Sequence, residues 1–440
     1  MFTLSQPVIP YTDPWPTPLA ERLRRTRQGK HRVAYLYETP DSGTFRYRVY
    51  NMIQALSARP EISATYFTSG ELAELARALH HLDVLVVGRY RYTNELSQLI
   101  SRARDHGKRV FFDTDDLVFD LDYVPLMTAT LDLNLVTPDL WDPWFAMVGR
   151  MGASLKLCEA ALTTNEYLAE RIRSFTGKKV SVIPNFINRE QQALAQKLYQ
   201  QKQASGFARD GRVHIGYFSG SATHNKDLEV AAGALARLLG KSPQVVLRIV
   251  GFMELKGPLR ELGARIERIE FQDYLNLQRY VAEVELNLMP LQDNEFTNCK
   301  SELKYFEAGI VGTVSIASPV FSYRQGIKDG VSGFLARAHE WDDKLAEALQ
   351  QLVERAVHDA LQGFWASMTM AAGSAGHIIS HTPQPTQASC TTGVGLPFTV
   401  SMLMAPLMGH SRTQRSQRSR PCASRSASPA SMSACVIVAE

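Results

Sequence analysis

The sequence has few cysteines, and they are not spaced for a structural role. The 440 residues include five, and no two of them form a C-x-x-C pair. An odd number without metal-ligand spacing predicts neither a disulfide framework nor a zinc site. The five are Cys158, Cys299, Cys390, Cys422 and Cys435.

Signals for export or membrane insertion are also missing. The first residues, MFTLSQPVIPYTDPWP, contain neither a basic start nor an apolar stretch, so no signal peptide is indicated. A longer apolar piece, Val394–Met408, is short for a membrane span and is interrupted by Pro397 and Pro406. We therefore expect a cytoplasmic protein.

The net charge of +4 does not indicate a nucleic-acid partner. Residues 361–440 contain five arginines, no lysine and one acidic residue, so 43 basic and 43 acidic residues balance in residues 1–360. A basic face for nucleic acid is not expected from such a body. Residues 361–440 are rich in Ser, Ala, Pro and Arg without a sustained period, which predicts a disordered, low-complexity tail.

Residues 1–30 form an N-terminal extension that is first Pro-rich and then basic. Two interpretations fit the basic part. It could make a peripheral contact with an anionic membrane, at its inner face, or form a solvated helix that leads into the first strand. The basic residues are Arg22, Arg24, Arg25, Arg27 and Lys30.

Strands and helices alternate between residues 31 and 190, and this alternation predicts parallel βαβ units in a doubly wound domain. The expected strands are residues 33–37, 82–87, 109–112, 160–164 and 179–183. The expected helices are residues 46–56, 94–106 and 166–175.

A polar, Gln-rich stretch at 191–211 predicts a helix and linker between domains, and the alternation then restarts over residues 212–360. The expected strands are residues 213–218, 245–251, 268–271, 285–289 and 314–317, and the expected helices are residues 226–239, 275–284 and 301–308. The fold class is therefore α/β, with two Rossmann-like, doubly wound domains. Since ligands bind at the carboxyl ends of such strands, both domains should face one cleft.

The segment 293–336 has the strongest chemical pattern. A loop that holds Lys300 and Ser301 leads into a helix that carries Lys304 and Glu307. Free N–H groups and positive potential at a helix start suit a phosphate, and a lysine there adds a charge for a diphosphate. A carboxylate further into the helix can reach ribose hydroxyls.

Three motifs in order carry a family resemblance: VIPNFIN at 182–188, IGYFSGSATHNKDLEVAAGAL at 215–235, and KS-x-x-KY-x-EAG at 300–309. Over about residues 30–345 the chain resembles retaining GT-B glycosyltransferases, and family 4 in particular. The resemblance implies transfer of a sugar, with retention, from a nucleotide-diphosphate sugar to a glycan, lipid or other acceptor. It implies no metal or other cofactor, and a role such as polysaccharide biosynthesis.

The resemblance also implies a donor site. Glu307 matches the second glutamate of the E-x7-E motif, which binds the donor ribose, while the first glutamate falls at Cys299. Lys226 matches the lysine that neutralises the diphosphate. The arginine expected five residues earlier falls at Ser221, and we expect Lys300 to replace its charge. The expected donor-binding residues are Gly220, Ser221, His224, Lys226, Cys299, Lys300, Ser301 and Glu307.

The acidic segment 113–116, DTDD, follows an expected strand of the first domain. Clustered carboxylates can bind Mg²⁺, bind acceptor hydroxyls or act as a base, or cap a polar turn. We expect no metal site, because these carboxylates share one short loop with no separated ligand. The expected catalytic residues are Lys226, Lys300, Glu307, Asp115 and Asp116.

Ser42 and Gly43 precede an expected helix that contains Arg46. This arrangement could receive the donor phosphate or an anionic acceptor. The alternative is a helix cap followed by surface arginines.

Two other classes of protein fit part of this pattern. A non-catalytic nucleotide-sugar-binding relative would explain Cys299 in place of a glutamate. A nicotinamide-dependent oxidoreductase can also use twin Rossmann domains, although no G-x-G-x-x-G fingerprint occurs between a strand and a helix.

Overall fold

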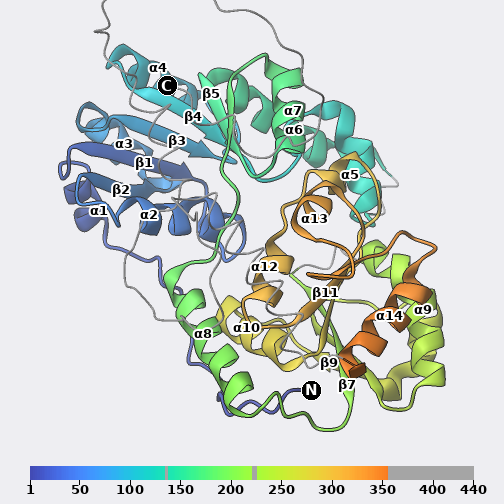
Figure 1. Ribbon diagram of the computed structural model, residues 1–440. Helices are drawn as coiled ribbons and strands as arrows, with labels where there is room; N and C mark the ends of the chain where they lie inside the picture. Colours follow the sequence, from blue (N-terminus) through green and yellow to red (C-terminus); the bar gives the residue numbers. More distant parts are fainter. Residues whose placement is uncertain (134–136, 221–224, 355–440) are drawn as a thin grey trace, which may run out of the picture.

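The computed structural model describes residues 1–133, 137–220 and 225–354. These residues form two parallel six-stranded sheets with helices on both faces (Figure 1). The two doubly wound domains expected from the sequence are confirmed. The tail expected at 361–440 lies outside the described residues.

The first sheet has the strand order β2-β1-β3-β4-β5-β6, and neighbouring strands are parallel throughout. Helices cover both of its faces, so its central strands are apolar on both sides and almost fully buried. The strands are β1 (His31–Tyr37), β2 (Ile62–Phe67), β3 (Val84–Gly88), β4 (Arg109–Asp113), β5 (Ala160–Thr163) and β6 (Val180–Val182).

Two hydrophobic cores lie on the two faces of this sheet. One includes Leu85 and Phe112 and is covered by α4 and α6, and the other includes Tyr35 and Phe111 and is covered by α2. The helical elements are α1 (Leu19–Arg25), the π-helical turn η1 (Arg46–Tyr50), α2 (Asn51–Leu56), α3 (Leu72–Ala78), α4 (Asn94–Asp105), α5 (Val124–Thr130), α6 (Pro138–Leu157) and α7 (Glu166–Thr176). Short 3₁₀ turns are η2 (Ser69–Glu71), η3 (Leu79–His81) and η4 (Leu121–Tyr123).

The second sheet has the order β12-β11-β10-β7-β8-β9, again with parallel neighbours. The direction of winding reverses between β7 and β10, the position where doubly wound sheets bind ligands. The strands are β7 (Val213–Ser219), β8 (Val245–Gly251), β9 (Ile266–Ile269), β10 (Leu286–Met289), β11 (Val314–Ala317) and β12 (Phe334–Leu335). The helical elements are α9 (Asn225–Lys241), η6 (Gly257–Arg265), α10 (Tyr274–Glu283), α11 (Glu295–Asn298), α12 (Leu303–Gly309), α13 (Phe321–Gly326) and α14 (Trp341–Glu354).

Two segments connect the domains. Helix α8 (Arg189–Ala204) leads from the first domain to the second and packs on α10 (Figure 1). The residues before α1 connect the domains a second time, from the second domain to the first. The backbone N–H of Phe2 donates to the carbonyl of Glu283 in the second domain, and Trp15 packs on Phe45 in the first.

The basic residues near the N-terminus do not form one exposed surface. Arg22 is buried, and its guanidinium pairs with Glu71 and lies over the ring of Tyr66. Arg25 pairs with Glu21 on the same helix. The expectation of a fully solvated basic helix is therefore wrong at Arg22, because that side chain fixes α1 to β2.

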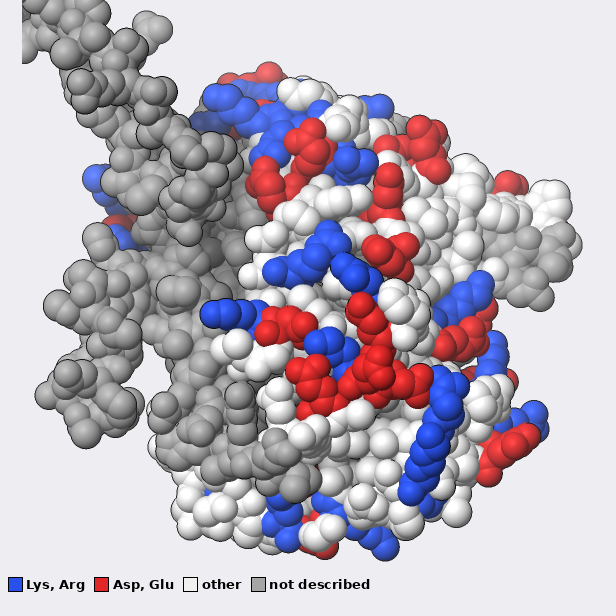
Figure 2. All heavy atoms as spheres, turned by 45° about the vertical axis from the view of Figure 1, so that its right-hand side comes forward, with Lys and Arg blue, Asp and Glu red and all other residues white. Residues whose placement is uncertain are grey.

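The surface charge is mixed, as expected from the sequence. On the face shown in Figure 2, basic and acidic side chains are interspersed, as the balance of charge in residues 1–360 predicts. In the part of the chain that the structure describes, no helix is both long and apolar enough to cross a membrane.

Candidate functional site

The carboxyl ends of the two sheets meet at a domain boundary that several polar contacts cross. The amide of Asn165 donates to the carbonyl of Cys299 over 2.8 Å, and that of Asn185 donates to the hydroxyl of Ser301 over 3.2 Å. Both asparagines follow strands of the first domain, whereas residues 299–301 follow β10 in the second. The loop expected to bind phosphate therefore lies directly against the first domain.

Glu307 lies on α12, with 13% of its side chain exposed at the domain boundary. Its Oε1 atom accepts hydrogen bonds from the hydroxyl of Tyr47 and, over 3.0 Å, from the amide of Gln191. The guanidinium of Arg46 lies 3.6 Å from the same oxygen. The expected ribose-binding carboxylate is therefore held by residues from the first domain and from α8.

Lys300 and Cys299 point in different directions. The ammonium of Lys300 lies 3.7 Å from a carboxylate oxygen of Asp116, across the cleft. The side chain of Cys299, expected at the donor site, is fully buried and packs in the core of the first domain beside Phe296.

Lys226 lies in the first turn of α9 and contacts the first domain at another point of the boundary. Its ammonium donates to the carbonyl of Ala129 over 2.9 Å and lies 3.5 Å from Asp132. Gly220 directly follows β7, while Ser221 and His224 lie outside the described residues. Lys226 keeps 38% of its side chain exposed.

The three aspartates of the acidic segment 113–116 lie in three different environments. Asp113 is buried and forms a bidentate pair with Arg48, and burial raises the pKa of Asp113 although the arginine opposes this. Asp115 accepts hydrogen bonds from Thr44 and Arg89, and Asp116 faces Lys300. No group of three His, Cys, Asp or Glu in residues 1–133, 137–220 and 225–354 is arranged to hold a metal ion.

Backbone groups of the turn at Ser42 and Gly43 form hydrogen bonds with neighbouring side chains of the protein. The backbone N–H of Gly43 donates to Asp41, and the carbonyl of Ser42 accepts from Arg46. Only 5% of Arg46 is exposed, so the alternative of a cap followed by surface arginines is wrong for this residue. The turn positions Arg46 against Glu307 rather than presenting it to solvent.

Lys304 lies near these residues and was not among the residues expected at the site. The ammonium of Lys304 lies 5.5 Å from the centre of the Tyr217 ring on β7, and Asp227, Lys300 and Glu307 are close enough to influence its charge. Burial lowers the pKa of Lys304, with the two carboxylates opposing this shift. The spacing KS-x-x-K, with a lysine in the loop and a second lysine four residues later in the helix, was the signal available in the sequence.

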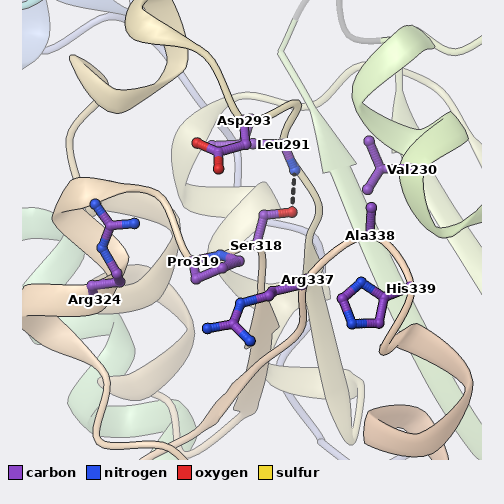
Figure 3. Close-up of a pocket in the computed structure, with 9 residues that line it drawn as sticks. All are labelled: Val230, Leu291, Asp293, Ser318, Pro319, Arg324, Arg337, Ala338 and His339. Carbon is purple, nitrogen blue, oxygen red and sulfur yellow. Dashed lines mark hydrogen bonds between the residues drawn. The ribbon is translucent and has the colours of Figure 1, made fainter.

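A cavity of about 350 Å³ opens at the carboxyl ends of β10 and β11 (Figure 3). The hydroxyl of Ser318 accepts a hydrogen bond from the backbone N–H of Leu291 at its base. None of the residues expected at the donor or acceptor site lines this cavity. Its lining consists of Val230, Leu291, Asp293, Ser318, Pro319, Arg324, Arg337, Ala338 and His339.

Comparison with protein families identifies the second domain. Residues 213–355 match the family described as Glycosyl transferases group 1. This match confirms the resemblance drawn from the motifs. No curated protein matches the chain in sequence.

Solved structures share the fold of both domains. The Anabaena protein HepE, in complex with UDP, superposes with a TM-score of 0.51 at 15% identity, covering 77% of this chain and 95% of that one. The trehalose-6-phosphate synthase OtsA gives 0.53 at 11% identity, over 86% and 98%. A trehalose-6-phosphate protein from E. coli bound with UDP-2-fluoro glucose gives 0.50 at 12% identity, over 86% and 98%.

Proposed function

We propose that this glycosyltransferase, whose residues 213–355 form a Glycosyl transferases group 1 domain on a GT-B fold, takes a UDP-hexose as its donor. The observation that supports a nucleotide donor most directly is that Glu307, Lys300 and Lys226 of the second domain all face charged residues of the first domain at the domain boundary. UDP is the nucleotide in HepE, and UDP-2-fluoro glucose is the ligand of the E. coli protein with the same fold.

In this proposal each charged residue has a role that the chemistry requires. Glu307 accepts the ribose hydroxyls, as in the family that the sequence resembles. Negative charge develops on the diphosphate as the glycosidic bond breaks, and cations fixed in advance around the cleft stabilise it. Lys226, Lys300 and Lys304 supply that charge.

The first domain supplies the acceptor side. Asp116 faces the cleft beside Lys300, and Asp115 is held by Thr44 and Arg89. We assign these carboxylates to the acceptor hydroxyls, which they can orient or deprotonate. We propose a glycan or a lipid-linked acceptor and a cytoplasmic enzyme, with a peripheral membrane contact if the acceptor is lipid-linked.

The proposal is tested by incubating the enzyme with UDP-glucose and a panel of acceptors. We expect release of UDP together with a new glycoside whose anomeric configuration, measured by NMR, matches that of the donor. Binding of the donor without UDP release from any acceptor or to water would favour the non-catalytic relative. An inverted product would contradict retention.

Removing divalent cations should not change the rate of turnover. Lysines rather than a metal neutralise the diphosphate in this proposal, and the carboxylates of the segment 113–116 are engaged by Arg48, Arg89 and Lys300. The measurement is UDP release from UDP-glucose in EDTA and in added Mg²⁺. Activity that is lost in EDTA and restored by Mg²⁺ would show that the enzyme needs a metal.

Replacing Lys300 with alanine should weaken UDP binding about tenfold, because a charge-assisted contact to the diphosphate is lost. Binding of uridine, which has no phosphate, should change little. Isothermal titration calorimetry measures both. Lys344→Ala is the control, since Lys344 pairs with Asp329 and Glu347 on the outer surface. Equal losses for UDP and uridine would remove Lys300 from the diphosphate site.

A further inference from the structure

Among the residues that the structure describes, the contacts to the carboxylate of Glu307 are all made to one of its two oxygens. Two donors and one cation converge on Oε1: the hydroxyl of Tyr47 and the amide of Gln191 donate hydrogen bonds, and the guanidinium of Arg46 forms an ion pair. In the part of the chain that the structure describes, the Oε2 atom accepts no hydrogen bond. A carboxylate has about four acceptor positions, so the Oε2 side keeps its full capacity for hydroxyl groups.

These donors come from outside the domain that carries Glu307. Tyr47 and Arg46 lie in the π-helical turn η1, which follows β1 in the first domain, and Gln191 lies in the first turn of α8. π-helical turns are rare and often occur at functional sites. The three donor side chains can engage the carboxylate together only when the two domains are in contact.

The donors themselves are fixed by packing and by further polar contacts. Arg46 lies 4.0 Å from the centre of the Tyr47 ring and 4.5 Å from that of Tyr274, and it donates to Gln191 over 3.0 Å. Gln191 also donates to Gln278 over 2.8 Å. A buried polar network in which each member has partners holds its groups in one arrangement.

Tyr47 can act only as a donor toward the carboxylate. Burial raises the pKa of Tyr47 well above its ordinary value, although Arg46 opposes this. The hydroxyl therefore keeps its proton at neutral pH. A hydrogen bond from a neutral hydroxyl to a carboxylate is directional and is stronger than a bond between two neutral groups.

We propose that Tyr47, assisted by Gln191, is a positioning residue for the nucleotide donor. It holds one oxygen of Glu307 so that the other oxygen faces the ribose. The inference rests on the proposed role of Glu307, and it adds that the first domain determines how well the second domain binds the ribose. The donor affinity of this enzyme is therefore coupled to contact between the domains.

The test is the variant Tyr47→Phe, which removes the hydroxyl and keeps the ring. We expect UDP to bind about tenfold more weakly, because the carboxylate loses a fixed orientation. Inorganic pyrophosphate, which has no ribose, should bind as it does to the wild-type protein. Isothermal titration calorimetry measures both ligands on the full chain.

The matched control is Tyr50→Phe. Tyr50 lies on the same π-helical turn, and its hydroxyl donates to Glu190 over 2.8 Å, outside the site. We expect its replacement to leave UDP binding unchanged. A general loosening of the turn would weaken UDP binding in both variants alike and would overturn the inference.

A double-mutant cycle with Glu307→Gln shows whether Tyr47 acts through Glu307. We expect Tyr47→Phe to have little further effect once Glu307 is replaced, whereas additive losses would overturn the inference.

If Tyr47→Phe does not fold, Gln191→Met takes its place in the same cycle. If the wild-type chain binds no nucleoside diphosphate, the proposed function fails, whereas UDP binding that is equal in wild type and Tyr47→Phe removes only the positioning role.

Discussion

Replacing Glu307 with alanine should weaken donor binding about ten- to hundredfold, whereas replacing Cys299 with alanine should cost only a small factor. Hydrogen bonds to a charged group contribute about 1.5–3 kcal/mol, which corresponds to that range of affinity. The thiol of Cys299 is a weak donor and acceptor, and burial raises its pKa, so it stays neutral. Its side chain also packs in the core of the first domain rather than in the cleft.

The comparison is made by calorimetry with UDP and UDP-glucose. Glu307→Gln is measured beside Glu307→Ala, because the shorter side chain also leaves Tyr47 and Gln191 without their acceptor. The unfolding temperature of each variant, measured without ligand, separates a loss of stability from a loss of affinity. Equal losses at positions 299 and 307, or none at 307, would mean that the family motif is misaligned.

Replacing Arg48 with methionine should destabilise the protein by about 3–5 kcal/mol. Arg48 and Asp113 are both almost fully buried, and their bidentate pair is supplemented by bonds from Arg48 to the carbonyl of Ile183 and the side chain of Asn185. Removing the guanidinium leaves a buried carboxylate and two further acceptors without their donor. Urea denaturation at neutral pH measures the free energy of unfolding.

The control for Arg48 is Arg237→Met, which breaks an ion pair with Asp342. Both of these side chains are about half exposed, so water screens the pair and the loss should be much smaller than for Arg48→Met. Replacing both Arg48 and Asp113 with apolar residues should cost less than replacing Arg48 alone, because no unpaired charge remains. Similar losses for Arg48→Met and Arg237→Met would show that the buried pair does not stabilise the fold.

Much of the fold could be predicted because its strands are apolar on both faces. The expected strands at 245–251 and 314–317 coincide with β8 and β11, since short apolar runs between turn residues are typical of parallel sheets. Strand β2 (Ile62–Phe67) was missed, because serine and threonine interrupt its apolar pattern. Helix α6 (Pro138–Leu157) was not among the expected helices, and Pro143 lies inside it, where proline ordinarily interrupts a helix.

The residue types of the site could be predicted, but not the partners of those residues. The motif placed Glu307, Lys300 and Lys226 in the second domain, and the structure brings each of them to the domain boundary. Neither periodicity nor spacing relates Glu307 to Tyr47, which lies 260 positions earlier and belongs to the other domain. The inward direction of Cys299 likewise depends on how the domains pack.

The most direct test of a nucleotide-sugar donor bound at Glu307 is a thermal-shift measurement on the wild-type chain and on Glu307→Ala. The panel consists of UDP-, GDP-, ADP- and dTDP-sugars. We predict that UDP-glucose stabilises the wild type, by about 2.7 kcal/mol at a hundred times its Kd, and that the variant loses most of this effect. A wild-type chain that no nucleotide sugar stabilises, or equal stabilisation of both proteins, would contradict the proposed donor site.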